Sequence, residues 1–203
     1  MAEPSRYKVG GDEIATDGVL KNKLNITDQA TLEDTETILL QDTYTNFFKL
    51  LEENKLDFNI KLLFKINEYF LEPLYSWAGK IRAVEISKDN VMFCASSQIQ
   101  KELVIFGKQL VKNIPDQNDS QKLISEKLAF IHCELNAIHP FREGNGRSIR
   151  LFLDLLAVNT GFSIIDFKKT SQIDYIAACI GCMQKDYSKM QKIIYKGLKR
   201  AKK

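Results

Sequence analysis

The most regular apolar pattern in this chain lies in the segment that leads up to His139. Its apolar side chains recur at steps of three and four residues, as on one face of an α-helix: Ile124, Leu128, Ile131, Leu135 and Ile138. Ser120 precedes this segment and can cap the helix, because its side chain can accept from an unpaired backbone N–H. A second apolar helix is predicted from about Gly146 to Asn159, ending at Gly161, which suits a left-handed cap.

Helical patterns cover most of the remaining chain. Further helices are predicted from Thr27 or Asp28 to Leu51, Asn59 to Phe70, Ile99 to near Pro115, Ser171 to Gln184, and Tyr187 to the end. One stretch predicts strands, because AGKIRAVEISKDNVMF, residues 78–93, alternates with period two around a polar SKDN turn. The predicted fold class is therefore all-α, a mostly α-helical bundle, with one β-hairpin near residues 80–94.

Length and charge limit the organisation of the chain. Its 203 residues and 23.3 kDa suit one domain, expected at residues 19–203 after a mobile tail at residues 1–18. The net charge of +3 is too small to predict direct nucleic-acid binding, and the basic end KIIYKGLKRAKK is expected to be solvated. The sequence shows no signal peptide and no membrane-length apolar run, so we expect no membrane association and a cytoplasmic location.

The cysteines are predicted to be small core residues. Cys94, Cys133, Cys179 and Cys182 are few and stand among apolar neighbours, unlike a disulfide framework. Cys179 and Cys182 form a C-x-x-C, for which a redox or zinc role is the alternative. That motif lies in a predicted buried helix, and the whole chain has only 2 histidines to complete a metal site.

Charge and glycine are concentrated in IHPFREGNGRSIR, residues 138–150, between the two apolar helices. A helix N-terminus exposes unpaired N–H groups and a partial positive charge, so the predicted helix start suits an anion. Gly144 and Gly146 lack a Cβ and let the backbone approach a ligand closely. Arg147 and Arg150 share a helix face, where two guanidinium groups suit a polyphosphate. The alternative interpretation of Arg147 and Arg150, each taken by itself, is a solvated surface side chain.

Two further residues of this loop indicate a reaction. Glu143 would be repelled by phosphate unless Mg²⁺ bridged them, and Mg²⁺ is commonly held by carboxylates together with phosphate oxygens. His139, for which the alternative is a structural histidine, has a side chain with an ordinary pKa of ~6.5 that suits a general base. A base beside a nucleotide phosphate indicates attack on phosphorus by a hydroxyl. Phe141 is expected to anchor the loop in the core, and Arg142 to face solvent.

The stretch HPFREGNGRSIR, residues 139–150, resembles the signature of Fic-domain proteins, H-x-F-x-(D/E)-G-N-G-R-x-x-R, with every specified position present. The similarity extends to DGVLKNKLNITDQATLEDTE, residues 17–36, and to YSWAGKIRAVEISKDNVMF, residues 75–93. It covers nearly the whole chain and implies the Fic fold of a bacterial stand-alone or toxin-like type. The implied activity is protein adenylylation, the transfer of AMP from ATP to a Ser, Thr or Tyr hydroxyl of a target protein.

The resemblance also implies a role for each signature residue. His139 would deprotonate the target hydroxyl, and Glu143 would hold Mg²⁺ against the α- and β-phosphates of ATP. An anion hole would be formed by Gly144, Asn145 and Gly146. Arg147 would bind the β- and γ-phosphates, and Arg150 would contact the γ-phosphate.

The predicted hairpin resembles the target-binding flap of the family, which clamps the target segment by strand-like pairing. On this chain the flap would consist of Ile86, Ser87, Lys88, Asp89 and Asn90. Bacterial toxins of this type are associated with type II topoisomerase subunits, which makes such a subunit one candidate target.

Two departures from family patterns bear on activity and control. A related kinase branch has Lys where this chain has Gly146, so the pattern favours nucleotide transfer. The inhibitory motif (S/T)-x-x-x-E-(G/N) is absent, and Glu143 is the last glutamate in the chain. By resemblance, inhibition would come from a small antitoxin-like protein that supplies a Glu to Arg150 in trans, or from an unusual internal group. Transfer of another nucleotide or of phosphocholine, and a catalytically silent interaction module, are the alternative functions.

Overall fold

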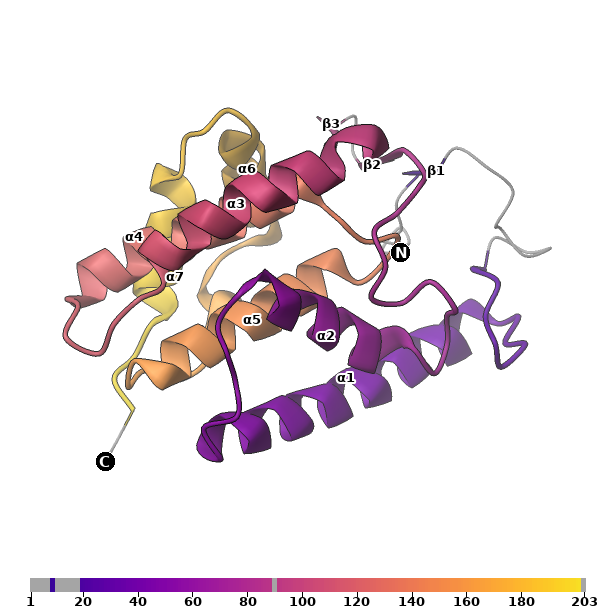
Figure 1. Cartoon of the computed structure of the whole chain (residues 1–203), viewed down its shortest axis with the longest axis horizontal. Coiled ribbons are helices and arrows are strands. Elements are labelled where there is room, and N and C mark those ends of the chain that lie inside the picture. Colours follow the sequence, from indigo (N-terminus) through magenta and orange to yellow (C-terminus); the bar gives the residue numbers. More distant parts are fainter. Residues whose placement is uncertain (1–7, 10–18, 89–90, 202–203) are drawn as a thin grey trace.

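The computed structural model describes residues 8–9, 19–88 and 91–201 of the chain. The elements in chain order are β1 (Lys8–Val9), α1 (Gln29–Glu52), α2 (Ile60–Leu71), β2 (Ile86–Lys88), β3 (Val91–Met92), η1 (Ser96–Gln98), α3 (Ile99–Asn113), α4 (Gln121–Ile138), α5 (Asn145–Asn159), η2 (Phe167–Lys169), α6 (Gln172–Met183) and α7 (Ser188–Gly197). Helices dominate, with one small sheet at the edge of the bundle (Figure 1). The predicted fold class is confirmed.

Helices begin where the sequence places capping side chains. The side chains of Asp28, Asn59, Ser120 and Ser171 each accept from a backbone N–H in the first turn of α1, α2, α4 and α6. Such a bond satisfies one of the N–H groups that a helix start leaves without an internal partner. The predicted helix starts at these positions are therefore confirmed.

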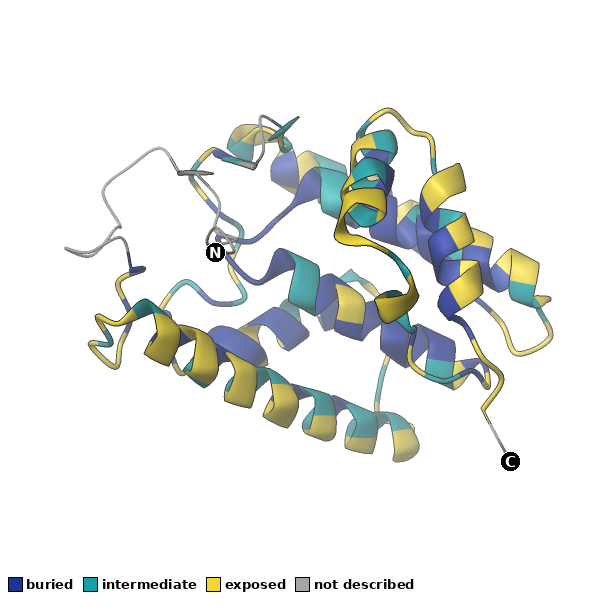
Figure 2. Cartoon of the chain, turned by 180° about the vertical axis from the view of Figure 1, so that it is seen from behind, coloured by how far each residue is buried: buried dark blue, intermediate teal, exposed yellow. Residues whose placement is uncertain are grey.

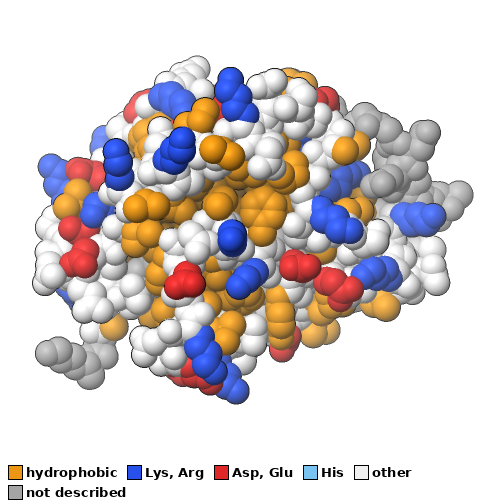
Figure 3. Space-filling model, viewed as in Figure 1, with side chains coloured by type: hydrophobic (Ala, Val, Ile, Leu, Met, Phe, Trp, Pro, Cys, Tyr) orange, Lys and Arg blue, Asp and Glu red, His pale blue; other side chains and the backbone are white. Residues whose placement is uncertain are grey.

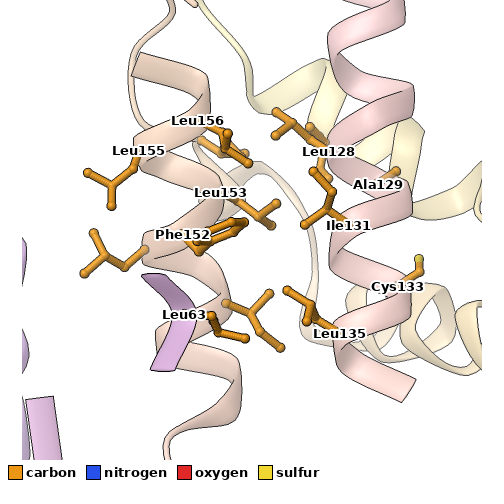
Figure 4. Close-up of a cluster of buried hydrophobic side chains, with 14 of the residues drawn as sticks. Leu63, Leu128, Ala129, Ile131, Cys133, Leu135, Phe152, Leu153, Leu155 and Leu156 are labelled. Atoms are coloured by element: carbon orange, nitrogen blue, oxygen red, sulfur yellow. The ribbon is translucent and has the colours of Figure 1, made fainter. Parts of the chain in front are cut away.

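Helix α5 is the central element of the fold. It lies between α2 on one side and α4 on the other (Figure 1), and 10 of its 15 residues are buried. Figure 4 shows Leu128, Ile131 and Leu135 of α4 facing the side chains of α5, among them Phe152 and Leu153. The exposed residues, coloured yellow in Figure 2, lie on the outer faces of the helices. A helix that is apolar over most of its circumference must be covered on several sides, so α5 organises the bundle.

The sheet differs in detail from the predicted hairpin. β2 and β3 pair antiparallel, with Ser87 opposite Met92, but residues 81–85 form no strand. This part of the hairpin prediction was wrong, because the backbone N–H of Arg82 donates to the carbonyl of Pro140 instead of to a strand. β1 adds a third antiparallel strand through Val9, opposite Ile86. Apart from Lys8–Val9, the predicted tail at residues 1–18 lies outside the described residues.

An open groove runs between α2 and α3 on the face shown in Figure 3. Apolar side chains form much of its lining, including Phe64, Ile81, Leu103 and Val104. Among the described residues, no helix combines the length and apolar character needed to cross a membrane.

Two cysteines form a covalent link that the sequence analysis did not predict. Cys133 of α4 and Cys182 of α6 are joined by a disulfide. Both are buried, as expected for core residues, but the expectation that they are unpaired was wrong, because α4 and α6 pack side by side and bring them together. Cys94 and Cys179 are free thiols of intermediate exposure. The C-x-x-C therefore supplies only one of its sulfurs to the cross-link.

We expect the variant Cys182→Ala to lose about 2–4 kcal/mol of unfolding free energy, since the disulfide closes a loop across a sequence separation of 49 and constrains the unfolded chain. Urea unfolding followed by circular dichroism measures this loss in non-reducing buffer. In a thiol reductant the difference between variant and wild type should shrink, and Cys94→Ala is the matched control. A wild-type midpoint that does not respond to the reductant would contradict the prediction.

Candidate active site

His139 is the residue at which α4 ends, and its backbone and side chain are both fixed. It has a left-handed backbone (φ 49°, ψ 63°), and its N–H donates to the carbonyl of Leu135 at 2.9 Å. Its Nδ1 lies 2.9 Å from the carbonyl oxygen of Asn136, and the ring of Phe93 stacks on the imidazole at 3.8 Å. A carbonyl can only accept, so Nδ1 carries the proton of the neutral ring and Nε2 is the basic nitrogen.

Arg82 holds the backbone that follows α4. Its Nε donates to the carbonyl of His139 at 2.8 Å, and its backbone N–H donates to the carbonyl of Pro140 at 2.9 Å. Its two terminal nitrogens donate to the carbonyls of Val84 and Cys94. Burial lowers the pKa of this guanidinium. The side chain thus joins the base of the flap to the loop after α4.

The amide of Asn145 closes the loop on itself. Its Oδ1 accepts from the N–H of Phe141 at 2.9 Å, and its Nδ2 donates to the carbonyl of the same residue at 2.8 Å. Phe141 is fully buried, with its ring edge-on to Phe64 at 4.9 Å, which confirms it as the anchor of the loop. Arg142 is buried as well, at 5% exposure, so the expectation that it faces solvent was wrong. The loop turns inward along its whole length, and the Asn145 side chain is engaged within it.

Asn67 of α2 supports the other end of the loop. Its fully buried Nδ2 donates to the carbonyl of Glu143 and to Oγ of Ser148, each at 3.1 Å. Gly144, the next residue, has φ +78°, and a Cβ there would lie 2.7 Å from Cδ1 of Leu71. Glycine is required at this position both for its dihedral and for the close approach of α2.

The carboxylate of Glu143 has one oxygen in use and one available. Oε1 accepts from the N–H of Gly144 at 2.8 Å and lies 3.4 Å from Nη2 of Arg147. Oε2 is buried and has no hydrogen-bond partner among the residues that the structure describes. A buried carboxylate oxygen without a donor is costly unless a cation completes it. Glu143 therefore fits the carboxylate ligand of a divalent cation.

Arg147 is held by a carboxylate from outside the signature. Its Nη1 lies 2.7 Å from Oε2 of Glu36 on α1, and its guanidinium lies over the ring of Phe70 at 4.8 Å. Oε1 of Glu36 accepts from the hydroxyl of Tyr75 at 2.8 Å. The structure therefore places Arg147 against α1 and α2.

Arg150 is directed toward a different part of the fold. Its guanidinium lies over the rings of Tyr175 at 5.1 Å and Phe167 at 5.7 Å. The Tyr175 hydroxyl is 2.8 Å from Nε2 of His132, whose pKa burial lowers to about 3. The two arginines were expected to share a face, but their guanidinium groups contact different elements, because an aromatic wall of η2 and α6 holds Arg150.

A cavity of about 190 Å³ brings three of the predicted site residues together. His139, Gly146 and Arg150 line it with Phe93 after β3 and Tyr175 of α6. Of the residues predicted for catalysis, metal binding and ATP binding, four do not line this cavity: Glu143, Gly144, Asn145 and Arg147. The arrangement is a basic nitrogen, a helix start and a guanidinium around one space, which suits an anion beside a base.

The predicted flap is described in part. Ile86 is buried, Ser87 is half-buried, and Lys88 is described in its backbone only. Asp89 and Asn90 lie outside the described residues.

Comparison with protein families decides the family. Residues 57–157 match the model of the Fic/DOC family, and this range contains the whole signature and the flap. The chain is a Fic-domain protein. Of the residues described above at the site, Glu36 of α1, Phe167 of η2 and Tyr175 of α6 lie outside the matched range of the Fic domain.

Curated relatives of this Fic-domain protein are named protein adenylyltransferase or probable protein adenylyltransferase. It is 36% identical over 148 residues to protein adenylyltransferase VbhT of Bartonella schoenbuchensis, a match that covers 72% of this chain and 30% of VbhT. It is 29% identical over 167 residues to the probable protein adenylyltransferase y4lH of Sinorhizobium fredii, covering 80% of this chain and 84% of that protein. The chain thus spans under a third of VbhT and most of y4lH.

The fold is shared with solved Fic structures. The crystal structure of BepC, a VirB-translocated effector protein of Bartonella tribocorum with bound AMPPNP, has a TM-score of 0.74 and 24% identity. The alignment covers 92% of this chain and 95% of that one. This likeness confirms the Fic fold.

Residues that contribute to the site of the Fic domain but were not found from the sequence include Glu36, Asn67, Arg82, Phe93 and Tyr175. Each acts across long sequence separations, up to 111 residues for the pair of Glu36 and Arg147. A polar residue at a predicted buried helix position is the one available signal, and Asn67 within IKLLFKINEYFL carries it.

The two glycines of the signature should respond oppositely to alanine. Gly144→Ala is expected to lose about 1–3 kcal/mol of unfolding free energy, since its Cβ would meet Leu71 at a left-handed backbone position. Gly146→Ala is the matched control, because nothing lies within 4 Å of its Cβ and Ala favours the helix by up to about 1 kcal/mol. Urea unfolding measures both, and a Gly144→Ala protein as stable as wild type would refute this account of the loop.

Proposed function

We propose that this Fic-domain protein transfers AMP from ATP to a hydroxyl side chain of a target protein. The observation that carries the proposal is the basic Nε2 of His139 in a cavity shared with Gly146 at the start of α5 and with Arg150. The relatives named protein adenylyltransferase and the AMPPNP bound to BepC support it.

His139 performs the proton transfer in this proposal. Its Nε2 accepts the proton of the target hydroxyl as the oxygen attacks the α-phosphorus of ATP. The bond from the α-phosphorus to the bridging oxygen breaks, and pyrophosphate leaves. The carbonyl of Asn136, 2.9 Å from Nδ1, accepts from the ring throughout and stabilises the imidazolium that forms.

The start of α5 binds the phosphates. Backbone N–H groups of Asn145 and Gly146 bind the anion, and Gly144 shapes the anion hole through its left-handed backbone, since its own N–H donates to Oε1 of Glu143. Asn145 contributes only through its backbone because its amide is bonded to Phe141. Arg150 and Arg147 supply positive charge for the β- and γ-phosphates. Mg²⁺, held through Glu143, would supply further positive charge against the α- and β-phosphates.

The flap presents an edge to the target. In the described sheet the strand order is β1-β2-β3, so β3 is an edge strand and its outer backbone groups can pair with an extended segment of a target protein. A topoisomerase subunit as target, a small antitoxin-like inhibitor at Arg150, and a cytoplasmic location stay predictions.

Labelled ATP separates this function from its alternatives. The protein and its His139→Ala variant are incubated with a bacterial lysate, Mg²⁺ and ATP labelled on the α- or the γ-phosphate. We expect label on protein from the α-position only, reduced at least about 100-fold in the variant because general-base catalysis contributes that much. Thermal unfolding of the variant serves as the control that it remains folded.

Other outcomes are equally specific. Label from the γ-phosphate alone would indicate a kinase, and label from UTP, GTP or a phosphocholine donor in place of ATP would indicate transfer of another group. The absence of any transfer by folded wild-type protein would leave the interaction module.

A further inference from the structure

A buried chain of polar contacts connects α1 to the signature. Tyr75 donates to Oε1 of Glu36 at 2.8 Å, and Oε2 of Glu36 lies 2.7 Å from Nη1 of Arg147. Glu36 is 3% exposed, and the Arg147 side chain is 29% exposed. A buried carboxylate is retained only when it is paired and hydrogen-bonded, and this one has both kinds of contact.

Arg147 lies between two carboxylates. Glu36 is at the distance of a charge-assisted hydrogen bond, whereas Oε1 of Glu143 is at 3.4 Å, beyond that range. Glu143 stands four residues before Arg147 on the adjoining turn, a spacing at which opposite charges attract. Glu36 and Glu143 thus compete for one guanidinium, and Glu36 makes the closer contact.

We propose that Glu36 is a positioning residue that holds Arg147 toward α1 and so keeps the carboxylate of Glu143 available to a divalent cation. The inference rests on the proposed function, in which Glu143 is the metal ligand. Without the charge of Glu36, Glu143 is the carboxylate that contacts Arg147 among the described residues. The guanidinium then closes the 3.4 Å gap to Oε1 of Glu143. Its positive charge, brought closer to the carboxylate, weakens the attraction of the neighbouring Oε2 for a cation.

Glu36 comes from a helix that flanks the Fic domain, so its contact with Arg147 forms only when the whole chain is folded. Glu36 lies on α1, outside the range 57–157 that matches the Fic/DOC model, whereas Glu143 and Arg147 lie inside it. The signature therefore contains a pair of opposite charges that could neutralise each other, and a flanking helix keeps the pair apart.

Metal binding measures this effect without any transfer reaction. Mn²⁺ stands in for Mg²⁺ and is titrated into the protein with AMPPNP, and free Mn²⁺ is followed by electron paramagnetic resonance. The variant Glu36→Gln keeps the size of the side chain and an acceptor for Tyr75 but removes the charge. We expect its Mn²⁺ dissociation constant to rise about tenfold, as for loss of one hydrogen bond to a charged group. Asp42→Asn, a charge removal at an exposed site on the same helix, is the matched control and should leave the constant unchanged.

A double-variant cycle assigns the effect to Arg147. In an Arg147→Gln background the further change Glu36→Gln should alter Mn²⁺ binding less than about twofold, because the group that moves is gone. A purely structural role of Glu36 would instead lower Mn²⁺ binding by the same factor in both backgrounds. In assays with saturating Mg²⁺, kcat of Glu36→Gln should return toward the wild-type value, while the Mg²⁺ concentration for half-maximal rate rises about tenfold.

Several results would overturn the proposal. Unchanged or tighter Mn²⁺ binding in Glu36→Gln would do so, as would an equal loss in the Arg147→Gln background. If Glu36→Gln does not fold, Tyr75→Phe replaces it: it loosens Glu36 and keeps its charge, and Mn²⁺ binding must weaken about threefold. A wild-type protein that binds Mn²⁺ with AMPPNP but transfers no label contradicts the proposed function and not the role of Glu36.

Discussion

The structure depends on how the buried backbone of residues 139–144 finds its hydrogen-bond partners. A loop that enters the core must have its carbonyl and N–H groups paired, or each one costs free energy. Side chains supply these partners, since Arg82 bonds to His139, Asn145 to Phe141, and Asn67 to Glu143. The three side chains come from three different segments. The conformation of the loop consequently depends on the assembled bundle around it, and these hydrogen bonds hold the backbone of His139 and Glu143 in place.

Local physics made much of the fold predictable. A cap needs only a few neighbouring residues, so Asp28, Asn59 and Ser120 marked their helices correctly, and the periodic stripe of α4 is buried as its spacing requires. The wrong predictions concern residues whose surroundings are formed by segments distant in the sequence. Arg142 is a charged loop residue by sequence, but the inward turn of the loop buries it. Cys133 and Cys182 are 49 positions apart, and only the packing of α4 on α6 brings them into contact.

The dependence on residues far away in the sequence also limits how much of the site could be predicted. The signature names His139, Glu143 and the glycines because they lie within one short stretch, where spacing alone fixes their relation. It does not show that the Asn145 amide is engaged within the loop, which removes its side chain from the set of ligand contacts. Nor does it show Glu36, whose contact with Arg147 spans 111 positions. The types of side chain that the loop carries were therefore known from the motif, and their partners and the balance of charge within the site were not.

The charges that surround the guanidinium group differ between the two arginines of the signature, Arg147 and Arg150. Arg147 forms an ion pair with Glu36 and lies near Glu143, so these carboxylates neutralise much of its positive charge. Arg150 lies over two aromatic rings and has no carboxylate in ion-pair range among the described residues. An aromatic face orients a guanidinium without neutralising it, so Arg150 keeps its charge for an incoming anion. The helix that supplies this face, α6, is tied by Cys182 to α4, which ends at His139. In the proposed function, the flanking helices α1 and α6 therefore determine how strongly Arg147 and Arg150 of the Fic domain attract phosphate.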